Sequence, residues 1–215
     1  MARAILTVVP PVAKPIFVNP TAEPAWDIAR LFPDQGSWSE EEYLALSGSC
    51  LVEFSHGSVE VLPMPTDSHQ AMVAFLYTAL LAFVSGDRGQ RLGTVRFAPL
   101  RLCLWPGKFR EPDLLFLRSE RDHLRSDRFW SGADLVMEVV STDDRDRDLV
   151  VKRREYARAG IDEYWIVDPH LAHITVLRRD GERYLEHGVF DAEQRAESAV
   201  LPGFAVVVSA VLSAG

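Results

Sequence analysis

Two carboxylates lie in segments of the sequence that are otherwise apolar. Glu138 interrupts the apolar run Leu135–Val140, and Asp113 follows Pro112 directly before the apolar run Leu114–Leu117. An ionised carboxylate buried without a partner costs several kcal/mol, so Glu138 requires a cation or a tight set of hydrogen bonds. A structural salt bridge to an arginine would also satisfy Glu138, and Pro-Asp is a common turn dipeptide. The two residues by themselves therefore leave a structural and a functional interpretation open.

Lys152 is the third residue of this set. It lies in a helix that the pattern predicts over Asp143–Ala159, and it shares a helical face with Leu149 and Tyr156. We therefore expect the side chain of Lys152 to point with the apolar face towards the sheet. A lysine whose ammonium reaches back to solvent fits the same pattern, so this alternative stays open.

Carboxylates at strand ends beside a lysine suit chemistry on phosphate esters. Glu53, in the apolar segment Leu51–Phe54, either joins Asp113 and Glu138 or faces solvent from an edge hairpin. Carboxylate oxygens bind Mg²⁺, which keeps several waters and accepts a phosphate oxygen. The bound metal lowers the pKa of a water and neutralises charge on the pentacovalent phosphate, and a lysine orients the attacking water or stabilises that charge.

Hydrophobic periodicity and turn residues predict the elements that position these groups. Ser39 and Glu42 form a capping box for a short helix over Glu40–Leu46, and a second helix, capped by Asp67 or Ser68, runs to Val84 and ends before Gly86. The predicted strands are Leu51–Phe54, Val59–Leu62, Thr94–Ala98, Leu100–Trp105, Leu114–Leu117, Leu135–Val140, Tyr164–Val167, Ile174–Leu177 and Phe204–Val208. The fold class is therefore α/β or α+β, with one mixed sheet flanked by helices.

Composition limits the number of domains. The chain has 215 residues, 47% of them hydrophobic and 25% charged, which suits one globular domain with an extension. Six of the 13 prolines fall within residues 1–33, so residues 1–36 are predicted to form an irregular arm and residues 37–215 the folded domain. The large apolar side chains of the arm favour docking, and we expect a homodimer to whose interface the arm can contribute. The alternative is that the arm folds back over its own domain and the chain stays monomeric.

Several classes of protein are excluded by the composition. No apolar run approaches the roughly 20 residues of a membrane span, and the N-terminal segment lacks the features of a signal peptide. Two cysteines rule out a disulfide framework and suit a reducing compartment, so a cytoplasmic protein that does not bind membranes is expected.

Charge is unevenly distributed along the chain. The net charge of −8 argues against a protein that coats nucleic acid without regard to sequence. Residues 88–110 nevertheless contain no Asp or Glu, and their basic side chains are either contacts to a nucleic-acid backbone or a solvated strand face. The candidate contacts are Arg96, Arg101, Lys108 and Arg110.

Longer motifs around these residues resemble a known family. The motifs are Glu111-Pro112-Asp113, Asp134–Ser141 and Lys152–Pro169, with Leu51–Gly57 and Ser68-His69 upstream. They are similar to the Uma-type family of proposed restriction endonucleases, a branch of the PD-(D/E)XK nuclease superfamily. The likeness covers about residues 37–209, and it is the joint pattern that is specific, since each short piece alone is weak.

The resemblance implies a restriction-endonuclease-like core, with Asp113 and Glu138 as the metal-binding pair. The superfamily lysine would stand two residues after the glutamate, where this chain has Val140, so Lys152 from the following helix is its expected substitute. Glu53 corresponds to the early acidic residue of the superfamily. His69 matches a family position, where it contacts phosphate or water or caps the start of its helix.

The expected function is Mg²⁺-dependent hydrolysis of DNA phosphodiester bonds, with Mn²⁺ as a possible substitute metal. Asp113, Glu138, Lys152 and Glu53 are the predicted catalytic residues, and the carboxylate oxygens of Asp113 and Glu138 should approach within about 4–6 Å of each other. The alternative is a catalytically silent module that keeps the fold and binds nucleic acid or a protein partner. All three of Asp113, Glu138 and Lys152 are present, which favours the enzyme.

Overall fold

The computed structural model describes residues 33–46, 51–86, 92–141 and 144–214. The chain divides into two compact units, Met1–Pro63 and Met64–Gly215. Almost all of the proline-rich arm predicted over residues 1–36 lies outside the described residues. The boundary between an arm and a folded domain therefore stays a prediction.

The first unit contains a short helix and a β-hairpin. Helix α3 (Glu40–Leu44) begins with the predicted capping box, in which the side chain of Ser39 accepts a hydrogen bond from the backbone of Glu42 and that of Glu42 accepts one in return. Strands β1 (Val52–Ser55) and β2 (Ser58–Val61) pair in antiparallel fashion. The two residues between them both have positive φ, 46° at His56 and 87° at Gly57, as in the tight turns that match the twist of a hairpin.

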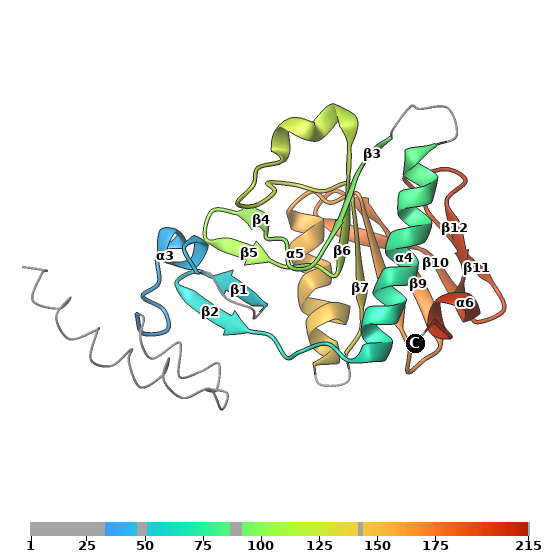
Figure 1. The fold of residues 1–215 in the computed structure, drawn as a ribbon, viewed down its shortest axis with the longest axis horizontal. Coiled ribbons are helices and arrows are strands. Elements are labelled where there is room, and N and C mark those ends of the chain that lie inside the picture. Colours follow the sequence, from blue (N-terminus) through green and yellow to red (C-terminus); the bar gives the residue numbers. More distant parts are fainter. Residues whose placement is uncertain (1–32, 47–50, 87–91, 142–143, 215) are drawn as a thin grey trace, which may run out of the picture. The chain divides into compact units, whose positions relative to one another are not determined.

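The second unit is built on a six-stranded mixed sheet with the order β10-β9-β8-β7-β6-β3 (Figure 1). Strands β7 and β8 are parallel, whereas every other neighbouring pair is antiparallel. The strands are β3 (Gly93–Phe97), β6 (Leu114–Arg118), β7 (Leu135–Val139), β8 (Glu163–Asp168), β9 (His173–Asp180) and β10 (Arg183–Asp191). The predicted fold class, with a central mixed sheet and flanking helices, is confirmed.

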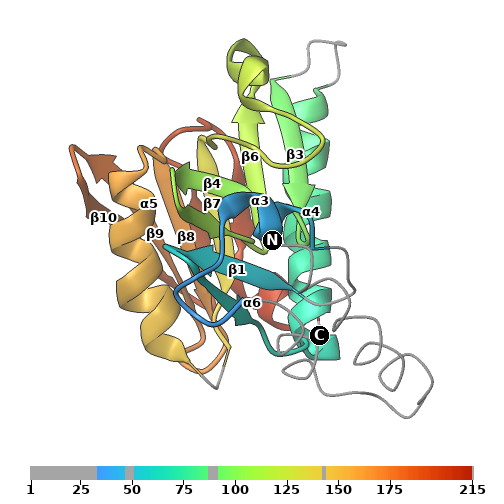
Figure 2. The same ribbon diagram turned by 90° about the vertical axis from the view of Figure 1, so that its left-hand side faces the viewer.

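The two faces of this sheet are covered by different helices, α4 (Asp67–Ser85) on one face and α5 (Arg153–Arg158) on the other (Figure 2). Along β7, Leu135 and Met137 pack in the hydrophobic cluster that contains α4, whereas Val136 packs in the cluster that contains α5. Strand β7 is thus buried on both faces, as its continuous apolar run predicts.

Helix α4 begins and ends close to the predicted positions. Its N-cap is Thr66, whose side chain accepts a hydrogen bond from the backbone N–H of His69, and not Asp67 or Ser68. Within the described residues α4 is long and apolar enough to cross a membrane by length and composition, which is weak evidence because core helices of soluble proteins meet the same criterion. Five of its side chains are buried, and they pack in the core cluster of the domain.

The helix that carries Lys152 differs from the prediction. A single α-helix was expected over Asp143–Ala159, but the structure has a π-helix, η3 (Arg147–Lys152), which continues into α5. A π-turn holds one more residue per hydrogen-bonded ring than an α-turn, and such turns occur frequently at functional sites.

The remaining elements are short, and several of them were not predicted. They are β4 (Leu102–Trp105), β5 (Lys108–Arg110), the 3₁₀-helix η2 (Ser119–Leu124), β11 (Arg195–Glu197), β12 (Ala205–Val207) and α6 (Val208–Leu212). Strands β4 and β5 form a hairpin, and β11 and β12 form a two-stranded sheet.

Candidate active site

The antiparallel pairing of β6 and β7 brings Asp113 next to Glu138. Leu114 is in register with Met137, so the residue before β6 meets the residues near the end of β7. The backbone N–H of Asp113 lies 3.4 Å from Oε2 of Glu138, and the backbone N–H of Val139 donates to Oδ2 of Asp113 at 2.8 Å. Each carboxylate is thus held against the strand that carries the other.

Lys152 is the cation closest to Glu138. Its ammonium nitrogen Nζ lies 2.9 Å from Oε1 of Glu138 and 2.9 Å from Oδ1 of Asp148. Lys152 is 5% exposed and Glu138 is 3% exposed, so this ion pair is buried. The ammonium of Lys152 therefore points towards the sheet and does not reach back to solvent, and the partner of Glu138 is a lysine and not an arginine.

Two further residues of this cluster were not identified from the sequence. The hydroxyl of Tyr156 donates a hydrogen bond of 2.6 Å to Oε1 of Glu138, the oxygen that also meets Lys152. Asp148 is buried on η3, and its backbone carbonyl accepts a hydrogen bond from the hydroxyl of Tyr164 at 3.1 Å. The i, i+4 spacing of Asp148, Lys152 and Tyr156 was the available signal, because residues so spaced share a helical face.

The cluster has an excess of negative charge. Burial raises the pKa of Glu138 to about 8; Lys152 opposes this rise, while the charges of Asp113 and Asp148 add to it. Burial likewise raises the pKa of Asp148, again against the influence of Lys152. Among the described residues, Lys152 and, at Asp148, the charge of Arg147 oppose three carboxylates, so a further cation would reduce the repulsion that remains.

His69 contacts the same carboxylate pair from the first turn of α4. Its Nε2 lies 3.2 Å from Oδ2 of Asp113. Burial lowers the pKa of His69, but the hydrogen bond and charge of Asp113, together with the charge of Glu138, outweigh it and leave the pKa raised. Its Nδ1 is buried without a hydrogen-bond partner in the described part of the chain. The side chain does not cap the helix, because Thr66 fills that position.

The donor set fits a hard divalent cation. In the described ranges, no three His, Cys, Asp or Glu side chains are already grouped as a metal-ion cage. Mg²⁺ does not need such a cage, because it binds through one or two carboxylates and takes water and substrate phosphate as its other ligands. The carboxylates of Asp113 and Glu138 are adjacent oxygen donors in a site with excess negative charge, and the 18% exposure of the Asp113 side chain leaves it in contact with solvent.

Glu53 lies in the other compact unit, on β1, in register with Glu60. It is buried, with 1% of its surface exposed. Its predicted role beside Asp113 and Glu138 stays a prediction.

The basic residues of segment 88–110 have different environments. Lys108 and Arg110 are buried, and both pair with Glu155, at 2.8 and 2.7 Å. Arg101 lies 3.7 Å from Glu111, whereas Arg96 is exposed. Contact of these four residues with nucleic acid stays a prediction, and three of them already have an acidic partner within the protein.

Comparison with known proteins identifies the family and the fold. The family model Uma2, described as "Putative restriction endonuclease", matches residues 40–211. The crystal structure of a putative nuclease belonging to DUF820 from Anabaena variabilis ATCC 29413 shares the fold, with a TM-score of 0.68 and 18% sequence identity over 82% of this chain and 98% of that chain. No curated protein matches the sequence. The match of the family model spans most of the chain, and the chain therefore belongs to the Uma2 family.

Proposed function

We propose that this protein is a Mg²⁺-dependent endonuclease that hydrolyses DNA phosphodiester bonds at the Asp113–Glu138–Lys152 cluster. The observation that carries the proposal is the environment of Glu138, a buried carboxylate that faces one lysine and two further carboxylates. The description of the family and the name given to the structural neighbour both refer to nucleases, which supports this class of reaction.

Asp113 and Glu138 would hold the metal ion, since they offer adjacent carboxylate oxygens. When bound, Mg²⁺ supplies positive charge to the phosphate and acidifies a coordinated water. Tyr156 and the backbone N–H of Val139 hold the two carboxylates in place through hydrogen bonds that do not depend on the metal.

Lys152 would act on the attacking water or on the charge of the phosphate. Its ammonium is fixed between Glu138 and Asp148, so its direction is set before a substrate binds. A preorganised charge in a buried site stabilises developing charge more strongly than one in water. His69, whose Nε2 lies 3.2 Å from Asp113, would orient that carboxylate or contact phosphate.

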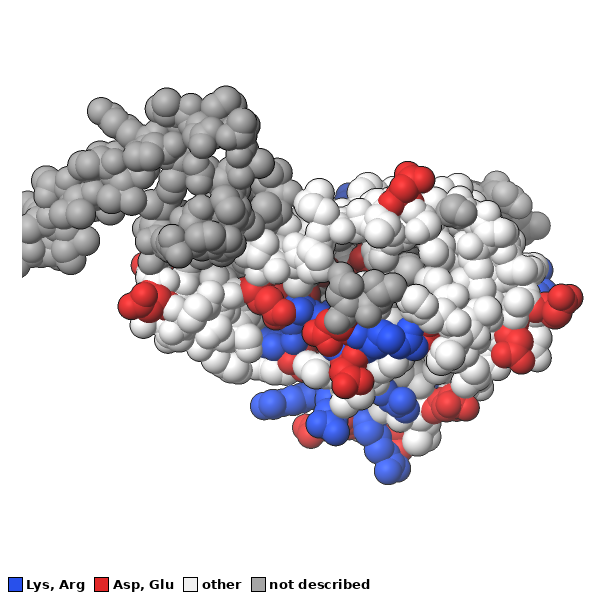
Figure 3. All heavy atoms as spheres, turned by 90° about the horizontal axis from the view of Figure 1, so that it is seen from below, with Lys and Arg blue, Asp and Glu red and all other residues white. Residues whose placement is uncertain are grey.

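The alternative function, a catalytically silent module that binds nucleic acid or protein, is also supported by an observation. The ammonium of Lys152 is shared by two carboxylates, and Lys108 and Arg110 pair with Glu155. Seen from below, Lys and Arg side chains lie among Asp and Glu side chains (Figure 3). Positive charge on that face is therefore local and not continuous.

A cleavage assay separates the two functions. The pure protein is incubated with supercoiled plasmid in Mg²⁺, in Mn²⁺ and in EDTA, beside a Glu138→Gln variant and an RNA substrate of matched length. Metal-dependent nicking of DNA by the parent protein, absent in the variant, supports the endonuclease. If the protein binds the plasmid without cutting it under either metal, the alternative holds.

We propose that the active form is a cytoplasmic homodimer, because cutting both strands of a duplex requires two active sites. Light scattering on the full chain and on a chain starting at Ser37 measures the mass of each. A monomeric mass for the full chain at micromolar concentration would contradict the dimer. An unchanged dimer after the shortening would remove the arm from the interface.

A further inference from the structure

A pocket of about 410 Å³ lies at the end of the sheet where β6 ends and β8 begins. Its lining residues come from β6, from β9, from the position before β8 and from the loop before β12, and they are Arg118, Asp162, Arg178, Arg179, Ala199 and Val200. Asp113 directly precedes β6, and Arg118 is its last residue. With a rise of ~3.3 Å per residue along a strand, the pocket lies about 17 Å from the candidate active site. It is a separate site, and its function does not depend on the proposed nuclease activity.

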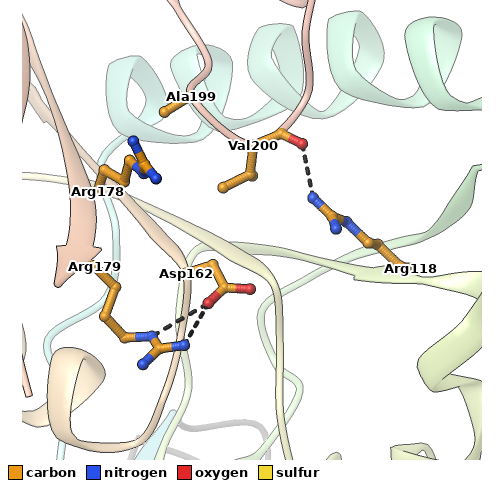
Figure 4. A pocket seen from close by; sticks show the side chains of 6 residues that line it. All are labelled: Arg118, Asp162, Arg178, Arg179, Ala199 and Val200. Atoms are coloured by element: carbon orange, nitrogen blue, oxygen red, sulfur yellow. Dashed lines mark hydrogen bonds and ion pairs between the residues drawn. The ribbon is translucent and has the colours of Figure 1, made fainter. Parts of the chain in front are cut away.

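The pocket is positively charged in a chain whose net charge is −8. Three guanidinium groups face one carboxylate, which leaves an excess of two positive charges at the site. Figure 4 shows the guanidinium groups of Arg178 and Arg118 on two sides of the pocket, with Val200 between them. Charge of this sign at a concave site attracts anions.

The three arginines differ in how many of their donors are already used. Arg179 binds Oδ1 of Asp162 with two nitrogens, at 3.2 and 2.7 Å, and its third nitrogen donates to the carbonyl of Gly181. Arg118 donates one side-chain hydrogen bond, of 2.8 Å, to the carbonyl of Val200. The side chain of Arg178, on β9, has no hydrogen bond or ion pair within the described residues. Arg178 and Arg118 thus retain donors for a ligand.

The walls of the pocket are held in place by buried contacts. The carboxylate of Glu163 accepts hydrogen bonds from the hydroxyl of Ser198 at 2.7 Å and from the backbone N–H groups of Ala199 and Val200. The backbone N–H of Arg118 donates to the buried carboxylate of Asp134 at 2.7 Å. The backbone of the walls is therefore ordered before a ligand binds, and the cost of ordering falls mainly on the exposed side chain of Arg178.

We propose that this pocket binds a phosphate group, with Arg178 and Arg118 as its donors and Arg179 as a fixed positive charge. The planar guanidinium fork matches phosphate oxygens in geometry and charge, which favours phosphate over a simple halide. The phosphate can belong to a small molecule or to a nucleic acid strand, and both sources share this chemistry.

Titration calorimetry of the full chain with inorganic phosphate, in EDTA and at low salt, tests the site. Arg178→Gln should weaken binding by about tenfold or more, because hydrogen bonds to a charged group are lost. The matched control is Arg183→Gln, which removes the same charge from an arginine whose side chain is 75% exposed and paired with Asp180. The control should bind phosphate within about twofold of the parent, since Arg183 does not line the pocket.

The proposal is overturned if the parent protein does not bind phosphate, or if Arg178→Gln binds it as tightly as the parent does. Arg118→Gln gives a second test, with circular dichroism to check that the fold is kept. Oligonucleotides with and without a 5′ phosphate then identify the source. If the parent protein binds both oligonucleotides and Arg178→Gln binds neither, the pocket recognises a backbone phosphate. If the parent binds only the oligonucleotide with a 5′ phosphate, the pocket recognises a terminal phosphate. Binding of neither, while inorganic phosphate binds, assigns a small molecule.

Discussion

Glu138 and Glu163 lie on adjacent parallel strands and are both almost inaccessible to solvent, at 3% and 0% exposure. Their surroundings differ in charge. Glu163 accepts hydrogen bonds from Trp165 Nε1, Ser198 and the two backbone N–H groups that follow Ser198, and no lysine or arginine of the described ranges pairs with it. Glu138 has Lys152 as a cationic partner and lies near two other carboxylates.

This difference in surroundings distinguishes Glu163, a structural carboxylate, from Glu138, a carboxylate suited to binding a cation. Burial raises the pKa of both residues, but at Glu163 the four donors oppose the rise, whereas at Glu138 the charges of Asp113 and Asp148 add to it. The oxygens of Glu163 are saturated by neutral donors, one from Trp165 on the same strand and the others from a loop about 35 residues later in the chain. A cation has a reason to bind at Glu138 and none at Glu163.

The largest expected effect is on cleavage. Glu138→Gln keeps the shape of the side chain but removes its charge, and it should lower the rate of plasmid cleavage by about 10³-fold, since metal-assisted charge stabilisation is worth several kcal/mol. Glu163→Gln, the same substitution on the neighbouring strand, should leave the rate of the folded protein within a few-fold of the parent. Equal cleavage by the parent and Glu138→Gln would contradict the assigned role.

The next effect is on stability. Glu163→Ala leaves the indole N–H of Trp165, the hydroxyl of Ser198 and two backbone N–H groups without their acceptor, and it should lower the free energy of unfolding by about 3 kcal/mol or more. Glu138→Ala should lower it less, or raise it, in metal-free protein, because it removes one of three neighbouring carboxylates while Lys152 keeps Asp148 as its partner. Urea denaturation in EDTA measures both, and the reverse order would contradict the comparison.

The pH dependence of stability should reveal the raised pKa of Glu138. The pKa of Glu138 is raised from 4.5 to about 8, so between these values the native state holds a proton that the unfolded state has lost. The free energy of unfolding should therefore fall as pH rises from 4.5 to about 8, by at most about 1.4 kcal/mol per pH unit for this group. The raised pKa of His69 acts in the same direction above pH 6.5.

Glu138→Gln should flatten this slope in urea denaturation measured in EDTA. Glu186→Gln, at an exposed position, is the matched control and should leave the slope unchanged. A slope that is the same in the parent and in Glu138→Gln would show that Glu138 does not hold the proton.

The smallest effect concerns single hydroxyl donors to each carboxylate. Ser198→Ala removes one donor to Glu163 and should lower the free energy of unfolding by about 1 kcal/mol without changing cleavage. Tyr156→Phe removes the corresponding donor to Glu138 and should lower the cleavage rate as well as the stability. If both variants affected only stability, the two carboxylates would have the same structural role.

The sequence predicted those site residues for which the neighbouring residues alone indicate a free-energy cost of burial. Glu138 stands out because a carboxylate in a strand buried on both faces needs compensation, and the apolar helical face correctly directs Lys152 towards the sheet. Glu163 was not recognised, because it directly follows Asp162 at the start of its strand. Most of its hydrogen-bond donors come from residues far along the chain, which the local sequence does not reveal. Asp148 was hidden in a run of charged residues that is typical of a solvated helix.

The fold shows the same limit. The long apolar strands and helix α4 were predicted within a few residues of their bounds, because their patterns follow from burial alone. Strands β5, β10 and β11 were missed because they are short or polar, and their pairing with a neighbour stabilises them more than their own sequence does. The π-helix was missed because no side-chain periodicity distinguishes it from an α-helix over six residues.

That π-helix has a consequence for how the family can diversify. A π-turn is an α-helix with one residue inserted, and in η3 the exposed valines Val150 and Val151 lie between Asp148 and Lys152. Loss of a single codon for one of these valines would restore an α-helical turn and leave Asp148 and Lys152 three residues apart instead of four. Both spacings keep two side chains on one face of a helix, so the salt bridge between Lys152 and Asp148 would keep its place. The family can therefore gain or lose one residue at this exposed position without separating the charged site from the fold.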